Sequence, residues 1–546
     1  MATCAEVIAE FLHDAGVRRI YGVPGEGASL AILEAARRRR IQFVLAHRPA
    51  AAAIMAATEG ELLGRPGICL LAQGPGVAGA VDGVAHAVLD QAPLLVLADR
   101  PSRLSRRLAA RQALDQVRLL DGVARESATL SAARTERLLR WAWDRAAGLP
   151  RGPVHLDIPA DQAARPARRR GLAPKPEAAG PPSAHAVRAA ARLLARRGRA
   201  LTVAGLGSRS DAASAALLDL VEHLGTPVFT TEKAKGVIPE DHPLAAGVFW
   251  GGRLEEELVG KADALLAVGL ESAELLPRAW RPGTPVVVLS EAPSGPRPYQ
   301  ATAEVGGDLR RSLEALRAES PPGGEWNRAG WAGVGGKFKA RARALLLEAG
   351  TAPGGEGLAP PRVVQMARAV FPRETIAAVD GGAHGLVASL FWESYDRTGY
   401  LCSSGLGAGG FALPAAVAAK LTLPARPVIA FTGDGGLLHS LSDVAVAARL
   451  SLPLVAVVFL DGALSLIRAA QEQRKYAPDA VALGTVDVAR LAEGVGALGT
   501  EVADEAELQK ALEEALGATQ PALIGVRVRG QTYRKMLEIL RGREPG

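Results

Sequence analysis

The sequence predicts an α/β protein made of three tandem doubly wound parallel-sheet domains. Helix-like and strand-like segments alternate along the whole chain, which is typical of parallel sheets covered by helices. The chain has 546 residues, too many for one ordinary core, so three domains of ordinary size are expected. Hydrophobic residues make up 48% of the chain and aromatic residues only 4%. That composition suits tightly packed helices and strands.

The first expected domain covers residues 1–165. Its helical spacing lies at residues 5–15 and 29–39. Its short apolar runs, which predict strands, are residues 19–23, 43–46, 68–72, 94–98 and 154–158. A linker rich in Pro, Arg and Gly follows at residues 164–183.

The second expected domain covers residues 184–335 and repeats the same alternation. Helices are predicted at residues 185–196 and 212–224. Strands are predicted at residues 200–204, 227–230, 264–268 and 286–289. The turn Gly205-Leu206-Gly207 follows the first of these strands. Two loose stretches, residues 319–328 and 349–361, lead into the last domain.

The third expected domain covers residues 356–546, and its strands are predicted at residues 376–379, 428–431, 455–460 and 522–528. The chain is organised around residues 428–467. A short apolar run there breaks at Gly433-Asp434-Gly435-Gly436, and helical spacing follows. A second apolar run then ends at Asp461-Gly462. This order predicts strand, tight turn, helix and strand.

The turn glycines and the two acids predict a site for a metal and a diphosphate. Ligands of open parallel sheets bind outside the carboxyl ends of the strands. Glycines there let the backbone approach a diphosphate, and the helix that follows supplies N–H donors. Asp434 and Asp461 are 27 residues apart, and neighbouring strand ends can bring them together. Their oxygens suit a hard cation such as Mg²⁺. The alternative is a turn with two exposed acids.

The segment resembles the diphosphate motif of thiamin diphosphate enzymes, which begins Gly-Asp-Gly and ends in Asn-Asn. In the acetolactate synthase-like group the last part reads NNxxYGxI, and here it is LDGALSLI at residues 460–467. The resemblance implies that Asp434, Asp461 and the carbonyl of Ala463 hold the metal, although Asp in place of Asn adds a negative charge. The cofactor-binding residues that it implies are Gly382, His384, Gly407, Gly409, Gly433, Asp434, Gly435, Gly436, Asp461, Ala463 and Leu464.

The resemblance extends over nearly the whole chain. The segments that carry it are residues 21–26, 64–67, 74–76, 89–95, 152–159, 235–244, 380–384 and 404–407. It implies a pyrimidine-binding domain, a central Rossmann-like domain and a diphosphate- and Mg²⁺-binding domain, in that order. In relatives the central domain sometimes holds FAD or an ADP moiety. For Gly205-Leu206-Gly207 the alternative is a structural turn.

The chain departs from the family pattern at three places, and the first two of them are the places most tied to activation of the cofactor. The family has a Glu that hydrogen-bonds N1′ of the pyrimidine ring. Matching forward from His47 puts Arg48 at that position, and counting back from Gly64 puts Pro49 there. Gly409 stands where a bulky apolar residue usually holds the bent form of the cofactor. Gln73 replaces the usual Ser or Thr before Gly-Pro-Gly.

Other residues are candidates for contact with the substrate. Glu26 follows the loop where some family decarboxylases place an acid, or it is a Glu favoured by a helix N-terminus. Gln112 resembles a pocket Gln of the family. His384 resembles the histidine beside the diphosphate, or it is a structural histidine. His47 and His439 are interpreted as structural.

The resemblance implies a thiamin diphosphate-dependent decarboxylase or carboligase acting on small 2-oxo acids. One alternative is a pseudoenzyme, or a regulatory partner subunit, because the activating Glu is absent. Another is a lyase of the 2-hydroxyacyl-CoA or oxalyl-CoA decarboxylase type, with an acyl-CoA substrate. A homodimer or homotetramer with active sites at the subunit interface is implied as well.

The composition excludes other classes. The net charge of +7 is mild, and the basic runs at residues 37–40 and 168–170 lack interleaved aromatics, so nucleic-acid binding is not expected. Three widely spaced cysteines argue against a disulfide framework or a zinc site. No signal peptide and no membrane span is expected, which predicts a cytoplasmic protein.

Overall fold

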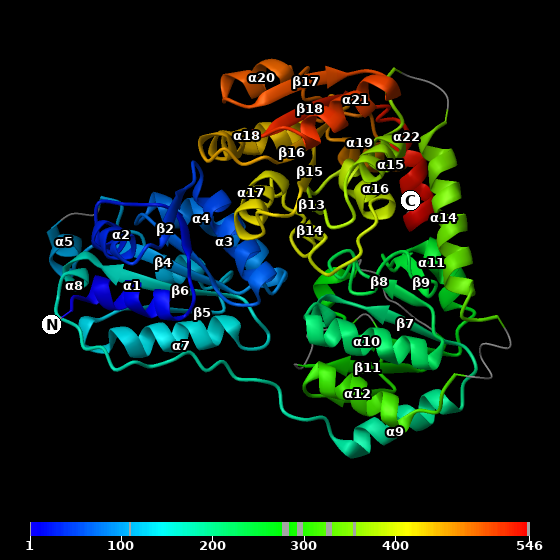
Figure 1. Cartoon of the computed structure of the whole chain (residues 1–546), viewed down its shortest axis with the longest axis horizontal. Coiled ribbons are helices and arrows are strands. Elements are labelled where there is room, and N and C mark those ends of the chain that lie inside the picture. The colour runs from blue at the N-terminus through cyan, green and yellow to red at the C-terminus, as the bar shows by residue number, and fades with distance from the viewer. Residues whose placement is uncertain are drawn as a thin grey trace. The chain divides into compact units, whose positions relative to one another are not determined.

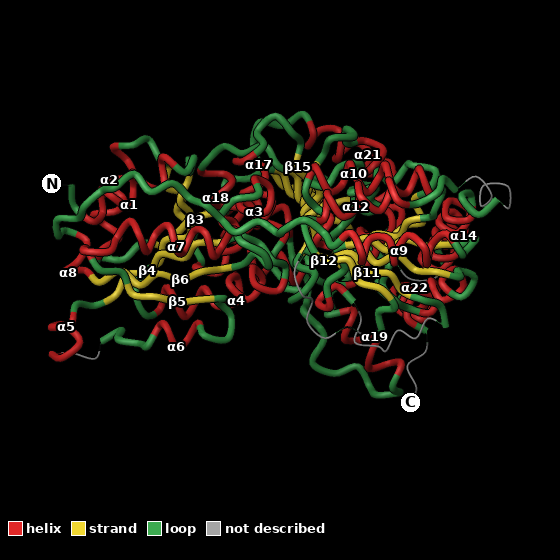
Figure 2. The backbone as a smooth tube through the Cα atoms, turned by 90° about the horizontal axis from the view of Figure 1, so that it is seen from below, coloured by secondary structure: helices red, strands yellow, loops and turns green. Residues whose placement is uncertain are grey.

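The computed structural model describes residues 2–108, 111–275, 283–291, 297, 299–323, 330–352 and 356–542. It contains three six-stranded sheets, and all strand pairs within them are parallel (Figures 1 and 2). The predicted α/β fold class is therefore confirmed. Parts of the expected loose stretches, residues 324–328 and 353–355, lie outside the described residues.

The residues group into two compact units. Unit 1 is Met1–Ala178 together with Val417–Pro424 and Ser440–Leu450, and unit 2 is Ala179–Ala416 together with Ala425–His439 and Ser451–Gly546. Helices α17 (Ala412–Thr422) and α18 (Asp434–Arg449) therefore begin in unit 2 and end in unit 1. Unit 2 contains two of the sheets, each with its own hydrophobic core.

The sheet of unit 1 has the order β2-β1-β3-β4-β6-β5. Its strands are β1 (Arg19–Val23), β2 (Gln42–Leu45), β3 (Gly67–Leu71), β4 (Leu94–Arg100), β5 (Glu126–Thr129) and β6 (Pro153–Pro159). The helices around it are α1 (Cys4–Asp14), α2 (Ala28–Arg38), α3 (Pro49–Leu63), α4 (Pro75–Leu89), α5 (Arg103–Leu108), α6 (Gln116–Leu120), α7 (Thr135–Ala147) and α8 (Ala160–Ala163), with a 3₁₀ turn η1 (Ala132–Arg134). Helix α3 is buried on all its faces, which explains its long run of alanines.

The second sheet of the chain, which is the first of the two in unit 2, has the order β12-β11-β10-β7-β8-β9. Its strands are β7 (Ala200–Ala204), β8 (Val228–Thr230), β9 (Ala245–Val248), β10 (Ala264–Val268), β11 (Val286–Ser290) and β12 (Ala303–Gly306). The helical segments with it are α9 (Ala184–Ala195), η2 (Leu206–Ser208), α10 (Asp211–Leu224), α11 (Arg253–Val259), η3 (Ser272–Glu274), α12 (Leu309–Glu319) and α14 (Val334–Gly350). In Figure 1 these elements are coloured from cyan to green.

The third sheet of the chain, which is the other sheet of unit 2, has the order β14-β13-β15-β16-β18-β17. This order repeats that of the unit 1 sheet. Its strands are β13 (Ile376–Val379), β14 (Tyr400–Cys402), β15 (Val428–Gly433), β16 (Val455–Leu460), β17 (Leu498–Val502) and β18 (Ala522–Arg527). Its helices, besides α17 and α18, are α15 (Pro360–Val370), α16 (Ala383–Phe391), α19 (Ser465–Gln473), α20 (Val488–Gly494), α21 (Glu505–Leu516) and α22 (Thr532–Arg541).

The strand orders place one crevice in each sheet. In the third sheet β13 lies between β14 and β15, so the chain leaves the carboxyl ends of β13 and β15 in opposite directions. In the second sheet the same reversal occurs between β7 and β10. Ligands of open α/β sheets bind at such reversals. A ligand site is therefore expected at one or both of the two reversals of unit 2.

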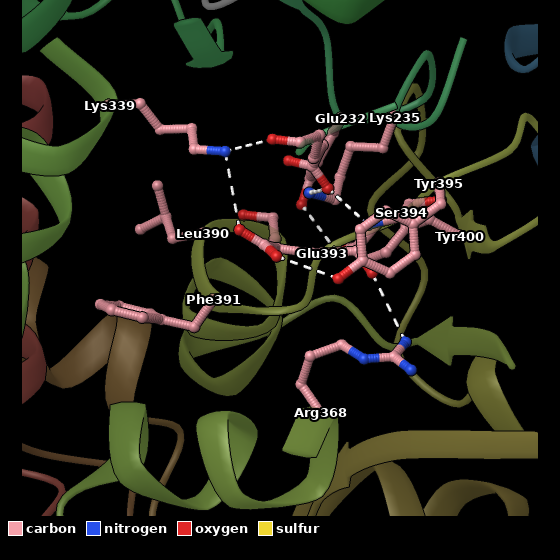
Figure 3. Close-up of polar contacts among 12 residues, drawn as sticks. Glu232, Lys235, Lys339, Arg368, Leu390, Phe391, Glu393, Ser394, Tyr395 and Tyr400 are labelled. Atoms are coloured by element: carbon pink, nitrogen blue, oxygen red, sulfur yellow. Dashed lines mark hydrogen bonds and ion pairs between the residues drawn. The ribbon is translucent and has the colours of Figure 1, made fainter. Parts of the chain in front are cut away.

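A polar network joins the two sheets of unit 2 (Figure 3). The Lys235 ammonium is fully buried and contacts a carboxylate oxygen of Glu240 at 2.6 Å. That carboxylate also accepts the N–H of Ser394 at 2.6 Å. Nearby, Glu393 accepts from the Tyr395 hydroxyl at 3.0 Å and pairs with Lys339 at 3.6 Å. Because buried charges are stable only when paired, this network fixes the two sheets against each other.

Glu255 of α11 is a buried carboxyl group that closes a turn. It accepts the backbone N–H of Trp250 at 3.0 Å and of Gly252 at 3.1 Å. Burial raises the pKa of Glu255 to about 7, and the N–H donors only partly oppose this rise. The folded state therefore keeps a proton that the unfolded chain, with the ordinary pKa of 4.5, releases.

This raised pKa predicts a pH dependence of stability. The contribution of Glu255 should be complete below about pH 4.5 and should be lost as the pH rises through about 7, by up to about 3 kcal/mol. Urea unfolding from pH 4 to 8 measures it, with Glu255→Gln as the comparison because glutamine does not titrate. We expect the free energy of unfolding to fall more steeply with pH in the wild type. Parallel curves would contradict the assignment.

The state of the three cysteines and the length of the helices can be read from the structure. Cys4, Cys69 and Cys402 are buried, and none of them forms a disulfide in the described part of the chain. Among the described residues, no helix combines the length and the apolar character that crossing a membrane requires.

Candidate functional site

A cavity of about 670 Å³ lies at the carboxyl ends of β13, β15 and β16 in unit 2. Residues from the part of the chain that forms the second sheet also line it, among them Glu232, Trp250 and Glu274. The structure brings together at this cavity every residue that the resemblance implied for the cofactor: Gly382, His384, Gly407, Gly409, Gly433, Asp434, Gly435, Gly436, Asp461, Ala463 and Leu464. The cavity therefore coincides with the reversal point of the third sheet.

The glycines after β15 are required by close packing around the turn. A Cβ atom on Gly436 would lie 2.2 Å from Oδ2 of Asp380 and 2.4 Å from Oγ1 of Thr432. A Cβ atom on Gly433 would lie 3.0 Å from Nδ1 of His384. A side chain at residue 436 would displace Asp380 or Thr432, and one at residue 433 would press on His384. Because the turn glycines line the cavity and carry no side chains, the backbone at the start of α18 is open to a ligand.

Asp434 and Asp461 converge at the strand ends. Oδ2 of Asp434 accepts the N–H of Gly462, the residue after Asp461, at 2.7 Å. Asp461 accepts the hydroxyl of Ser465 at 2.6 Å and the N–H of Ala463 at 3.2 Å. Burial raises the pKa of both carboxyl groups, and that of Asp461 reaches about 6 because the charge of Asp434 adds to the effect of burial. A buried carboxylate and a partly buried one that repel each other are a favourable environment for a divalent cation.

The donor set fits an oxygen-coordinated ion. Ala463 lies between the two acids and helix α19, and its carbonyl accepts one N–H, from Ser465 at 3.0 Å. A carbonyl oxygen has a second lone pair, which leaves it able to bind a cation. Among the described residues no group of three or more His, Cys, Asp or Glu side chains could hold a metal. A cation here would therefore take oxygens from the two acids, the backbone and its ligand, as Mg²⁺ commonly does.

His384, at the start of α16, is a neutral buried histidine facing the cavity. Its ring stacks on Phe459 with the centroids 5.8 Å apart. Burial lowers its pKa to about 4. Its Nε2 has no hydrogen-bond partner among the described residues. A neutral imidazole with an unpaired nitrogen can form a hydrogen bond with a ligand in the cavity. The resemblance implies a histidine at this position, beside the diphosphate.

Gly409 faces open space in the cavity wall. A Cβ atom placed there would meet nothing within 4 Å, whereas one on neighbouring Gly410 would lie 3.1 Å from Nδ1 of His439. A side chain at residue 409 would therefore begin in open space at the cavity wall. His439, which we interpreted from sequence as structural, is exposed and lines the cavity.

Sequence reasoning missed several residues of the cavity wall. Trp250 and Tyr533 each line the cavity and carry a buried polar atom without a hydrogen-bond partner among the described residues. Neither belongs to a motif. The available signal for Tyr533 was its place just after the last apolar run of the domain, because that strand ends beside the strand of Asp461.

In unit 1, an acid other than Glu26 accepts a hydrogen bond from the first turn of α2. Glu26 is exposed. The N-cap residue of α2, Gly27, has no side chain, and Asp99 from the end of β4 accepts the Ser29 N–H at 2.7 Å instead. Asp99 therefore takes the role at the helix N-terminus that was one alternative for Glu26. The signal was available, because Asp99 directly follows an apolar run.

Gln112 packs closely against Gly74, the residue after Gln73. A Cβ atom on Gly74 would lie 2.8 Å from the carbonyl oxygen of Gln112. Gln112 itself is exposed and has a positive φ of 56°. The buried glutamine of this region is Gln116, whose side-chain oxygen accepts the Gly74 N–H at 2.8 Å and whose amide donates to Asp157. Gln116 therefore holds the Gln73 loop in place.

Arg48 and Pro49 form the start of α3. Pro49 is the first helical residue and Arg48 is the N-cap. Nη2 of Arg48 contacts Oδ2 of Asp443, from the part of α18 that belongs to unit 1, at 2.7 Å. The Asp443 side chain is 0% exposed and that of Arg48 24%. Arg48 thus has a structural role, and neither candidate position supplies an acid.

Removing Arg48 should destabilise the fold. We expect Arg48→Ala to lower the free energy of unfolding by about 2–4 kcal/mol, because the buried Asp443 carboxylate loses this cation. Arg37→Ala is the control, since Arg37 pairs with Glu34 on the surface and should cost under about 1 kcal/mol. In chemical denaturation, equal losses from the two variants would show that the buried pair contributes nothing special.

The turn Gly205-Leu206-Gly207 at the reversal point of the second sheet is filled from within the protein. The Glu274 carboxylate accepts the N–H groups of Leu206 and Glu271, both at 2.9 Å, which are the contacts that a phosphate would make. Burial raises the pKa of Glu274 to about 7. A Cβ atom on Gly207 would lie 2.9 Å from Cα of Gly269. These contacts favour the structural turn over an FAD or ADP site.

Three models of one family match the chain in order. They are the thiamine pyrophosphate enzyme N-terminal TPP binding domain at residues 2–119, the central domain at residues 187–316 and the C-terminal TPP binding domain at residues 380–526. The C-terminal match covers the strand ends that line the cavity.

Curated relatives match over almost the full length. The probable 2-ketoarginine decarboxylase AruI of Pseudomonas aeruginosa is 29% identical, over 96% of this chain and 94% of the relative. The probable acetolactate synthase large subunit of Methanocaldococcus jannaschii is 28% identical, over 96% and 91%. The acetolactate synthase of Bacillus subtilis is 24% identical, over 96% and 93%.

Proposed function

Because the chain belongs to the thiamine pyrophosphate enzyme family, of the acetolactate synthase-like type, we propose that it binds thiamin diphosphate with Mg²⁺ and acts as a decarboxylase or carboligase on small 2-oxo acids. The observation that carries the proposal is the convergence of Asp434 and Asp461 on one cavity at the reversal point of the third sheet. The names of the relatives, a 2-ketoarginine decarboxylase and acetolactate synthases, support this substrate class.

The residues of the cavity divide into binding roles. Asp434, Asp461 and the Ala463 carbonyl would hold the cation, and the open backbone at the start of α18 would donate to the diphosphate. His384 presents an uncharged ring nitrogen to the same space. Once bound, the cofactor supplies the carbanion chemistry that decarboxylation and carboligation need.

A second candidate function rests on Arg48 and Pro49. The resemblance puts an acid at one of these positions, and in this chain one residue is a proline and the other pairs with Asp443. A positioned acid–base group contributes roughly 10²–10⁴-fold to a rate. Its loss is compatible with a slow enzyme, and also with a protein that binds the cofactor without normal turnover.

Binding and proton exchange together test the two candidates. Calorimetry with thiamin diphosphate and Mg²⁺ measures binding, and loss of the C2 proton signal in heavy water measures activation. Binding with exchange supports the enzyme, and binding without exchange supports the second candidate. Failure to bind thiamin diphosphate in the presence of Mg²⁺ would contradict both.

We also propose that a second copy of the chain completes the site. Two large apolar side chains that line the cavity are exposed, Leu464 at 44% and Ile467 at 53%. Exposed apolar groups gathered at one place favour an interface. Light scattering tests this, because a strictly monomeric protein would exclude a site shared between subunits.

A further inference from the structure

Tyr533 is a buried phenol whose hydroxyl faces the cavity region without a hydrogen-bond partner in the described part of the chain. It is 1% exposed and lines the cavity. Buried polar groups in folded proteins are almost always hydrogen-bonded. An unpaired hydroxyl at a cavity wall therefore indicates a partner that is not part of the protein chain.

The surrounding structure fixes the ring. Tyr533, Met536, Leu537 and Leu540 form a buried stripe along α22 at helical spacing. Tyr533 lies at the N-terminal end of this stripe, and its own N–H donates to the carbonyl of Gly530 at 3.2 Å. In Figure 1 this helix is the red segment beside the C-terminus.

The same turn touches the proposed cation site. A Cβ atom on Gly530 would lie 2.9 Å from Oδ2 of Asp461, so the backbone before α22 packs directly on that acid. Burial, and then the charges of Asp461 and Asp434, hold the pKa of Tyr533 well above its ordinary value. A phenol, with its ordinary pKa of about 10, keeps its proton near neutral pH and can act as a hydrogen-bond donor.

We propose that the Tyr533 hydroxyl donates a hydrogen bond to an oxygen of the diphosphate group held in this cavity. The inference rests on the proposed function, since it names a further residue for the same cofactor. A diphosphate oxygen is the acceptor that suits a protonated phenol beside a cation site, and a bond to a charged acceptor is stronger than one between neutral groups. Tyr533 is thus a binding residue.

The test removes only the oxygen atom, with Tyr533→Phe. Calorimetry in Mg²⁺ measures the Kd of two probes, thiamin diphosphate and inorganic pyrophosphate. We expect both values to rise about tenfold or more in the variant. We also expect the melting temperature without ligand to stay the same or to rise, because no internal hydrogen bond is lost.

Tyr21→Phe is the matched control. Tyr21 is also fully buried, but its hydroxyl donates to Glu59 at 2.7 Å in unit 1. This variant should melt at a lower temperature and bind both probes as the wild type does.

Equal Kd values for the wild type and Tyr533→Phe would overturn the inference alone, and so would a loss confined to thiamin diphosphate, because pyrophosphate shares the proposed acceptor. A wild type that binds neither probe would overturn the proposed function and this inference with it. The two failures are therefore distinguishable.

Discussion

Asp434→Asn is expected to weaken Mg²⁺-dependent binding of pyrophosphate and of thiamin diphosphate by about 100-fold or more, because even the loss of a residue that only supports a metal ligand costs roughly 10–100-fold in affinity. The substitution removes a negative charge from the proposed cation site. It also removes an acceptor, because the two oxygens of Asp434 accept the N–H groups of Gly435 and Gly462. The amide nitrogen of asparagine must face one of those donors. Calorimetry at fixed pH, with and without Mg²⁺, measures the change.

Asp504→Asn is the control for this loss. Asp504 is an exposed N-cap of α21 that accepts the Glu507 N–H at 2.8 Å, and asparagine caps a helix equally well. The control should bind as the wild type does. If Asp434→Asn also binds normally, or if the wild type binds pyrophosphate equally well without Mg²⁺, then the two acids do not hold a cation.

The central strands of the fold could be predicted from sequence, and most edge strands could not. Every strand missing from the prediction, namely β5, β9, β12, β14 and β17, lies at an edge of its sheet. Central parallel strands are buried on both faces and appear as continuous apolar runs. An edge strand such as β17 is exposed over its first residues, and β14 has only three residues, so the apolar signal is lost.

The motif residues of the site were predictable for a related reason. Glycines and acids at the ends of apolar runs mark the carboxyl edge of a parallel sheet, and all of the implied cofactor residues line one cavity. Tyr533 and Trp250 reach the same cavity from segments without a motif. The sequence contains no signal for Trp250, and for Tyr533 the only signal is its place just after the last apolar run, because the positions of both residues depend on how α22 and the turn before α11 pack.

The turn Gly205-Leu206-Gly207 shows where sequence stays ambiguous. A glycine turn after a strand fits a phosphate ligand and an internal carboxylate equally well. The decision depends on Glu274, which follows the turn by almost seventy residues and reaches it only through the parallel pairing of β7 with β10. Contacts of such long sequence separation are visible only in the folded chain.

Pro49→Glu is expected to speed exchange of the C2 proton of bound thiamin diphosphate by roughly 10²-fold or more, because it restores an acid at one of the two positions implied by the family pattern. The fold should accept it. Pro49 is the first residue of α3, where the helix dipole favours a negative charge. Its ring lies against Gly79: a Cβ atom on Gly79 would be 3.2 Å from Cγ of Pro49. The ion pair of Arg48 with Asp443 competes with any pairing to the new acid.

Pro49→Gln separates the acid from the other effects of the substitution. Glutamine has the size of glutamate and also removes the proline ring, but it cannot accept a proton from N1′. Exchange should therefore accelerate in Pro49→Glu and stay near the wild-type rate in Pro49→Gln, with similar Kd values for the cofactor in both. If the two variants exchange at the same rate, residue 49 does not face the pyrimidine ring, and Arg48 becomes the position at which to place the acid.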